Sequence, residues 1–191
     1  MDERKLTRRE AVEWLLGAMA AGSAWPLLAS EHPMHEHLKN AALLDRADAE
    51  VSSSSWKPLF LHPSQRESLA AVAEAMVPGS NKAQVDRFID LLLSVDTADH
   101  QKSFVESLAS VEEAATKRFG RGFSALTAGE QESALTIVSQ DERQRDHFDN
   151  LKEWIAGAYY SSEEGMRELG WDGKRAFVKF PGCEHAVDHR G

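Results

Sequence analysis

Apolar residues in the stretch 58–170 recur every three to four positions, the spacing of helices that bury one face. Two of these helices are predicted to begin at a capping box, Ser64-Gln65-Arg66-Glu67 and Thr127-Ala128-Gly129-Glu130. No segment of useful length alternates apolar and polar residues, as a strand would. The pattern predicts an all-α fold, an irregular antiparallel bundle of about five to six helices. The expected helices cover approximately residues 64–77, 85–92, 99–119, 128–138, 146–160 and 161–169.

The first 29 residues have the layout of an export signal. A positive segment carrying Arg4, Lys5, Arg8 and Arg9 precedes an apolar stretch, 11–29, that is rich in Ala, Gly and Leu. The Arg8–Arg9 pair in front of a weakly apolar stretch is similar to a twin-arginine signal. Because that route moves folded chains, it predicts a cofactor in this chain or in a partner that travels with it.

Two other interpretations of the N-terminal segment compete with the export signal. One is a short amphipathic first helix, which Glu13 inside the apolar stretch favours. The other is a membrane-spanning helix, but that needs about 20 continuous apolar residues. Glu13 and Pro26 interrupt the run, so a spanning helix is the least favoured of the three.

The regions flanking the predicted bundle differ from it in composition. Residues 30–57 combine three histidines with a run of serines, so they are predicted to be a linker with a short helical patch around 38–47. Residues 171–191 are predicted to be an irregular tail. Its aromatic residues, with those at the end of the bundle, predict a partner-binding surface, although the tail folding back on its own bundle is an open alternative. The predicted contact residues are Tyr159, Tyr160, Trp171, Phe177, Phe180 and Cys183.

Composition narrows the class of protein. With 191 residues, 42% of them hydrophobic, the chain is long enough for one globular domain without disulfides or a structural metal. The formal net charge of -9 argues against non-specific nucleic-acid binding, which requires an excess of Lys and Arg. The single cysteine excludes a disulfide scaffold and a four-cysteine zinc site.

Motifs for the common cofactors and catalytic centres are missing from the sequence. It contains no Gly-x-Gly-x-x-Gly after a strand, no Cys-x-x-Cys-His, no Gly-x-Ser-x-Gly and no His-Glu-x-x-His. The carboxylates lie on the wet faces of the predicted helices, and no pair stands out as general acid and base. We therefore expect no catalytic residue and no cofactor bound by this chain.

Two groups of residues are candidate metal ligands. Imidazoles three and five residues apart can converge in a flexible segment, and a second set combines sulfur with nitrogen. Neither spacing is a recognised zinc pattern. In an oxidising compartment the lone thiol has other uses as well, an inter-subunit disulfide or a buried free thiol. The two sets are His32, His35 and His37, and Cys183, His185 and His189.

Three ordered segments resemble one family, the gluconate 2-dehydrogenase subunit 3 family, over roughly Leu59 to His185. The segments are Leu69 to Gly79 with its Pro78-Gly79 stop, Val85 to Leu93, and Tyr159-Tyr160-Ser161-Ser162 through Gly170-Trp171-Asp172-Gly173. The resemblance implies a non-catalytic small subunit for a large FAD-bearing sugar or alcohol dehydrogenase, often with a cytochrome c subunit that carries haem c. It also implies export by the twin-arginine machinery to the periplasm or to the periplasmic face of the inner membrane, and help in maturation of the large subunit, which would choose the substrate.

A different class of function is kept as the alternative. The chain would then be a free-standing periplasmic helical protein that binds a metal through one of the two ligand sets above.

Overall fold

The computed structural model describes residues 6–20, 32–51 and 53–170, and within these ranges all regular structure is helical. The helices are α1 (Arg8–Ala20), α2 (Pro33–Leu38), α3 (Ala41–Val51), α4 (Pro63–Met76), α5 (Val85–Leu93), α6 (Ala98–Phe119), the short 3-10 turn η2 (Phe123–Ala125), α7 (Ala128–Gln140), α8 (Arg145–Tyr160) and α9 (Glu163–Glu168). The all-α prediction is confirmed, and α4 to α9 are the six helices expected in residues 58–170.

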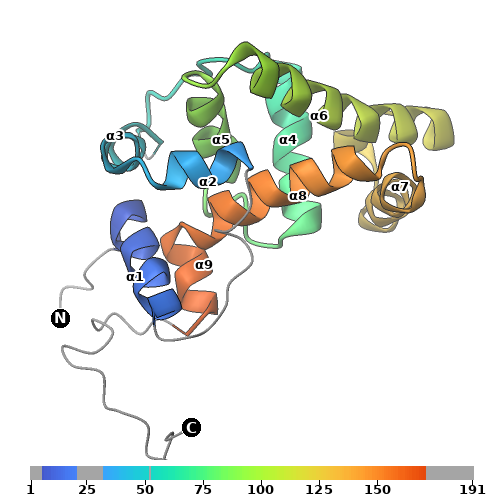
Figure 1. Ribbon diagram of the computed structural model, residues 1–191. Helices are drawn as coiled ribbons and strands as arrows, with labels where there is room; N and C mark the ends of the chain where they lie inside the picture. Colours follow the sequence, from blue (N-terminus) through green and yellow to red (C-terminus); the bar gives the residue numbers. More distant parts are fainter. Residues whose placement is uncertain (1–5, 21–31, 52, 171–191) are drawn as a thin grey trace, which may run out of the picture.

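The body of the protein consists of helices α2 to α8. Helix α5 is buried along nearly all of its length, and α8 crosses the middle of the molecule beside it (Figure 1). Trp154 of α8 lies at the centre, edge-on to Phe104 of α6, with 5.6 Å between the ring centroids. One continuous apolar core therefore joins α2 to α8.

One buried and one partly buried carboxylate fix the connections between these helices. Asp90 of α5 is fully buried and accepts the main-chain N–H groups of three consecutive residues, Leu59 at 2.6 Å, Phe60 at 3.1 Å and Leu61 at 2.6 Å. Glu74 of α4 accepts the N–H groups of Gly79 at 3.0 Å and Asn81 at 2.8 Å. Each carboxylate satisfies donors that would otherwise lack a partner inside the protein.

Within the predicted linker, residues 33–38 and 41–51 are helical, and the second of these helices overlaps the helical patch predicted around 38–47. These residues form α2 and α3 and contribute Met34, Leu38, Leu44 and Ala47 to the main core. A six-residue helix is too short to show a hydrophobic period, and its histidines resemble a polar loop. Its apolar residues, Met34 and Leu38, are buried because α2 packs against α8.

Helix α4 begins earlier than the Ser64 capping box predicted. His62 is the N-cap, Pro63 occupies the first turn, and the reciprocal partner is Gln65. Proline suits this position because its missing N–H has no partner in the first turn of a helix. The Thr127–Glu130 capping box at the start of α7 is confirmed.

Helix α1 packs against α3 and beside α9 at the edge of the body (Figure 1), and its Val12 belongs to the main apolar core. Ala11 and Leu15 meet Met166 of α9 in a small separate cluster, bordered by Leu6 and Trp14. We call α1 together with α9 the corner. None of the described helices is long and apolar enough to span a membrane.

Candidate functional site

The most unusual polar group in the described residues is the guanidinium of Arg8, because only 6% of this residue is exposed. Its Nη1 donates to the carbonyl oxygen of Ala158 at 2.8 Å and to Oγ of Ser161 at 3.1 Å. Its Nη2 donates to the carbonyl oxygen of Ala83 at 3.0 Å. The Cζ atom lies 3.9 Å from the ring centroid of Phe88, a cation–π distance.

The main chain of Arg8 is also held. Its N–H lies 3.2 Å from Oδ1 and 3.0 Å from Oδ2 of Asp48 in α3. This carboxylate sits at the start of α1, where a helix favours negative charge. We call the five partners of Arg8 the Arg8 site: the carbonyl oxygens of Ala83 and Ala158, the hydroxyl of Ser161, the ring of Phe88 and the carboxylate of Asp48.

Burial affects the charge of Arg8 but does not remove it. Loss of water lowers the pKa of Arg8 to about 10, while the negative charges of Asp48 and Glu164 act in the opposite direction. The side chain therefore stays protonated at neutral pH. Ala158 and Ser161 lie at the C-terminal end of α8, where unpaired carbonyls and the helix dipole favour a cation.

The second arginine of the pair has a different environment. The side chain of Arg9 is 47% exposed and forms ion pairs with Glu13 at 3.0 Å and Asp45 at 3.2 Å. The hydrogen bond that Arg9 donates to Glu13 is the main reason that the pKa of Arg9 is raised. The two arginines of the predicted export motif therefore differ: the side chain of Arg8 is buried and that of Arg9 faces solvent.

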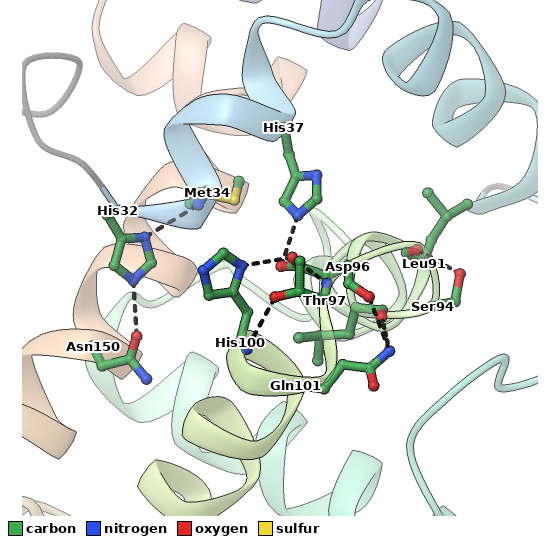
Figure 2. A network of polar contacts seen from close by, with 11 residues as sticks. His32, Met34, His37, Leu91, Ser94, Asp96, Thr97, His100, Gln101 and Asn150 are labelled. Atoms are coloured by element: carbon green, nitrogen blue, oxygen red, sulfur yellow. Dashed lines mark hydrogen bonds and ion pairs between the residues drawn. The ribbon is translucent and has the colours of Figure 1, made fainter.

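Figure 2 shows where His32 and His37 lie. His32 uses both ring nitrogens: Nδ1 accepts the N–H of Met34 at 3.2 Å, and Nε2 lies 2.8 Å from Oδ1 of Asn150. His37 Nε2 lies 2.9 Å from Oδ2 of Asp96. His35 is buried, 3.9 Å from the carboxylate of Glu153.

Asp96 receives a second imidazole, because His100 Nδ1 lies 2.7 Å from its Oδ1 (Figure 2). Burial acts to raise the pKa of Asp96, but hydrogen bonds from His37, His100 and the N–H of Thr97 outweigh it, so the pKa lies below its ordinary value. These contacts fasten α2 to the start of α6.

Of the two sets of candidate metal ligands, the structure describes only the histidines of residues 32–37. In the part of the chain that the structure describes, no three His, Cys, Asp or Glu side chains are grouped so that they could hold a metal ion. The hydrogen bonds of His32 and His37 instead hold α2 against α8 and α6. Cys183, His185 and His189 lie outside the described residues.

The predicted partner-contact residues fall into two groups. Tyr159 is only 5% exposed and donates its hydroxyl to Glu168 at 2.9 Å, and burial followed by this hydrogen bond raises its pKa to about 12. Tyr160 is half-buried and stacks edge-on against Tyr159. Their role toward a partner stays a prediction. The remaining residues, Trp171, Phe177, Phe180 and Cys183, lie outside the described residues.

Tyr159 also explains the Pro78-Gly79 stop. Gly79 has a positive φ of 97°, and a β-carbon there would lie 3.1 Å from the tyrosine hydroxyl. A residue without a side chain satisfies both the backbone conformation and the close approach. Two motif segments that are distant in the sequence therefore meet in the fold.

A hollow of about 390 Å³ lies between α4 and α6. Glu112 lines it, accepting the hydroxyl of Ser68 with one carboxylate oxygen and the N–H of Phe123 at 3.1 Å with the other. The carboxylate therefore ties α4 and η2 to α6.

Comparison with known families gives one match. A family model described as gluconate 2-dehydrogenase subunit 3 matches residues 63–182, which is more than half of the chain and includes α4 to α9. No curated protein and no solved structure matches the chain.

Proposed function

Because the chain belongs to the gluconate 2-dehydrogenase subunit 3 family, we propose that it is the non-catalytic small subunit of a gluconate 2-dehydrogenase-like complex. The match over residues 63–182 is the observation that carries this proposal. The large subunit would hold FAD and perform the oxidation of a sugar or an alcohol. A cytochrome c subunit with haem c would complete electron transfer in complexes that have one.

The hydrogen bonds of three acidic side chains, one buried and two partly buried, support a scaffolding role. Asp90, Glu74 and Glu112 all accept main-chain N–H groups at the turns between helices. A carboxylate used in this way stabilises a particular path of the chain. The protein is thus built as a rigid helical body, suited to presenting a surface to another chain.

The N-terminal segment is proposed to direct export. Arg8 and Arg9 would be recognised by the twin-arginine machinery, which would carry the folded large subunit together with this chain to the periplasm or to the periplasmic face of the inner membrane. This assigns the small subunit a role in export and maturation. The contact with the large subunit would involve the aromatic residues of the tail, with Cys183 available for an inter-subunit disulfide.

The proposal is tested by purifying the tagged full chain from the cells that make it. We expect a larger protein with the visible absorption of a flavin to co-purify at a fixed ratio. The complex should reduce an artificial electron acceptor when a sugar or polyol is supplied, and the small chain alone should not. Turnover by the isolated small chain, or its purification without any flavoprotein, would contradict the proposal.

The role of the tail needs a separate variant. Deleting residues 181–191 is expected to loosen the complex while the far-ultraviolet circular dichroism of the small chain stays the same, because these residues follow all the described helices. Unchanged co-purification would remove the tail from the interface. A reducible heavier band on a non-reducing gel would assign the disulfide to Cys183, and a Cys183→Ser variant is the matched control.

A further inference from the structure

We infer that the Arg8 site is a binding site for an arginine-bearing helix, and that it holds the predicted export signal so that Arg8 is not accessible while α1 is docked. The effect on export depends on the proposed export function. The existence of the binding site is argued from the contacts of Arg8 alone. Its components come from α3, from the turn before α5, from α5 and from the end of α8. A site assembled from such distant segments exists only once the body has folded.

The acceptors select a guanidinium over an ammonium. Nη1 and Nη2 point to different oxygens, on Ala158 and Ala83, while the flat face of the group covers the Phe88 ring. A planar group with donors on two nitrogens matches this arrangement. A lysine, whose donors all radiate from one atom, cannot span the two carbonyls and stack on the ring at the same time.

The remainder of α1 adds apolar contacts, because Val12 belongs to the main core and a smaller cluster lies against α9. Ala11 and Leu15 follow Arg8 at helical spacing and pack against Met166, so the ligand is an amphipathic helix with an arginine in its first turn. Arg9 points to solvent from the same turn. The docked helix therefore presents one arginine of the pair and hides the other.

Two binding events compete for the same side chain as a result. An export receptor that reads both arginines needs Arg8 outside its site, so its apparent affinity is reduced by the fraction of molecules in which α1 is open. Docking of α1 requires that the body has folded, whereas recognition by the export receptor requires that α1 has left the Arg8 site. The Arg8 site thus makes recognition of the signal depend on the state of the small subunit.

Hydrogen exchange of the purified full chain tests the site without any assay of export. The chain is produced in cells that lack the twin-arginine transporter. Losing charged hydrogen bonds in Arg8→Lys should speed the exchange of α1 amides, residues 11–15, by at least about tenfold. The matched control Arg9→Lys should leave that exchange within about twofold, because an exposed ion pair contributes little. Equal effects of the two substitutions, or none with Arg8→Lys, would overturn the inference.

A second pair of variants opens α1 without changing the signal. Asp48→Asn weakens the contact to the Arg8 N–H, whereas Asp45→Asn on the same helix removes only a surface partner of Arg9. We expect faster α1 exchange in Asp48→Asn alone, with the α5 amides protected as in the parent. If Asp48→Asn also exposes α5, the milder Ser161→Ala, which removes one acceptor of Nη1, takes its place.

Export is then measured by pulse-chase in cells with the transporter. The rate should rise in Asp48→Asn relative to Asp45→Asn, in proportion to the open fraction seen by exchange. An equal rate in spite of an open α1 would overturn the competition. If every chain stays in the cytoplasm while the exchange results hold, the binding site stands and the export function fails.

Discussion

The body around Trp154 and the corner around Arg8 are stabilised in different ways. In the body, one apolar core extends from α2 to α8, so each helix packs against several others. In the corner, Val12 reaches the main core, and a small separate cluster of Ala11, Leu15 and Met166 is supplemented by the hydrogen bonds of one arginine. Apolar packing tolerates small shifts, whereas directional bonds are lost when one group changes. The corner is therefore the part of the molecule that a single substitution can detach.

The strongest way to break the body is to remove its central ring. Trp154→Ala leaves a cavity against Phe104 and is expected to lower the free energy of unfolding by about 3–5 kcal/mol. Chemical denaturation monitored by circular dichroism measures the loss. The matched control is Trp14→Ala in the corner, where the ring is only partly buried. A comparable loss in the two variants would show that the partly buried ring in the corner contributes as much to stability as the central ring.

A glycine tests how the corner is joined to the body. A β-carbon on Gly165 would lie 2.4 Å from the carbonyl oxygen of Tyr159, so Gly165→Ala must displace α9. We expect a loss of about 1–3 kcal/mol and faster exchange of α1, which packs on α9. Gly129→Ala in the first turn of α7 is the control, because a β-carbon there meets nothing within 4 Å. Its stability should be unchanged or slightly higher. Unaltered α1 exchange in Gly165→Ala would show that α9 does not support α1.

The attachment of α2 to the body should depend on pH through His32. Burial lowers the pKa of His32 below its ordinary 6.5. The hydrogen bond that His32 donates to Oδ1 of Asn150 and the charge of Glu153 oppose this shift, and the charges of His35 and His100 add to it. The unfolded chain then binds the proton more readily, so stability is lost as the pH falls below 6.5. Protonation would also place a hydrogen on Nδ1, which accepts the N–H of Met34.

His32→Asn is expected to flatten part of this loss between about pH 7 and pH 5, since asparagine is a good N-cap that does not titrate. Denaturation midpoints across that range measure the slope. The comparison at about pH 8, where imidazole is neutral in both states, corrects for the effect of the substitution itself. A slope as steep as that of the parent would assign the pH dependence to other groups.

The smallest expected effect is at Arg9. Asp45→Asn removes one of two exposed ionic partners, and such pairs are screened by water and salt. We expect the denaturation midpoint to stay within the error of the measurement. A clear loss of stability would mean that Arg9 is held as firmly as Arg8, and the contrast between the two arginines would disappear.

The sequence was sufficient to predict the helices of residues 58–170, because their apolar stripes are long and their ends carry recognisable caps. Thr127 and Glu130 are an example, since both act within one turn. The start of α4 was missed because a histidine ring serves as its cap, outside the usual Ser, Thr, Asp and Asn. The sequence therefore predicts features that depend on contacts within one helix, such as its apolar face and its cap.

The candidate site could not be predicted in the same way. In the sequence, Arg8 looks like half of a surface motif. The oxygens that accept hydrogen bonds from its guanidinium lie 75 to 153 positions further along the chain. The sequence near Arg8 does not predict that the carbonyl of Ala83 and the end of α8 surround its side chain. The burial of α2 could not be predicted either, since Met34 and Leu38 have helical spacing but two positions are too few to establish a period.

The position of α9 has a consequence for the first and the last of the described helices. Met166 of α9 packs against Ala11 and Leu15 of α1, and the two helices lie side by side (Figure 1). A displacement of α1 would therefore expose Met166, so an event at the first helix would change the surface of the last.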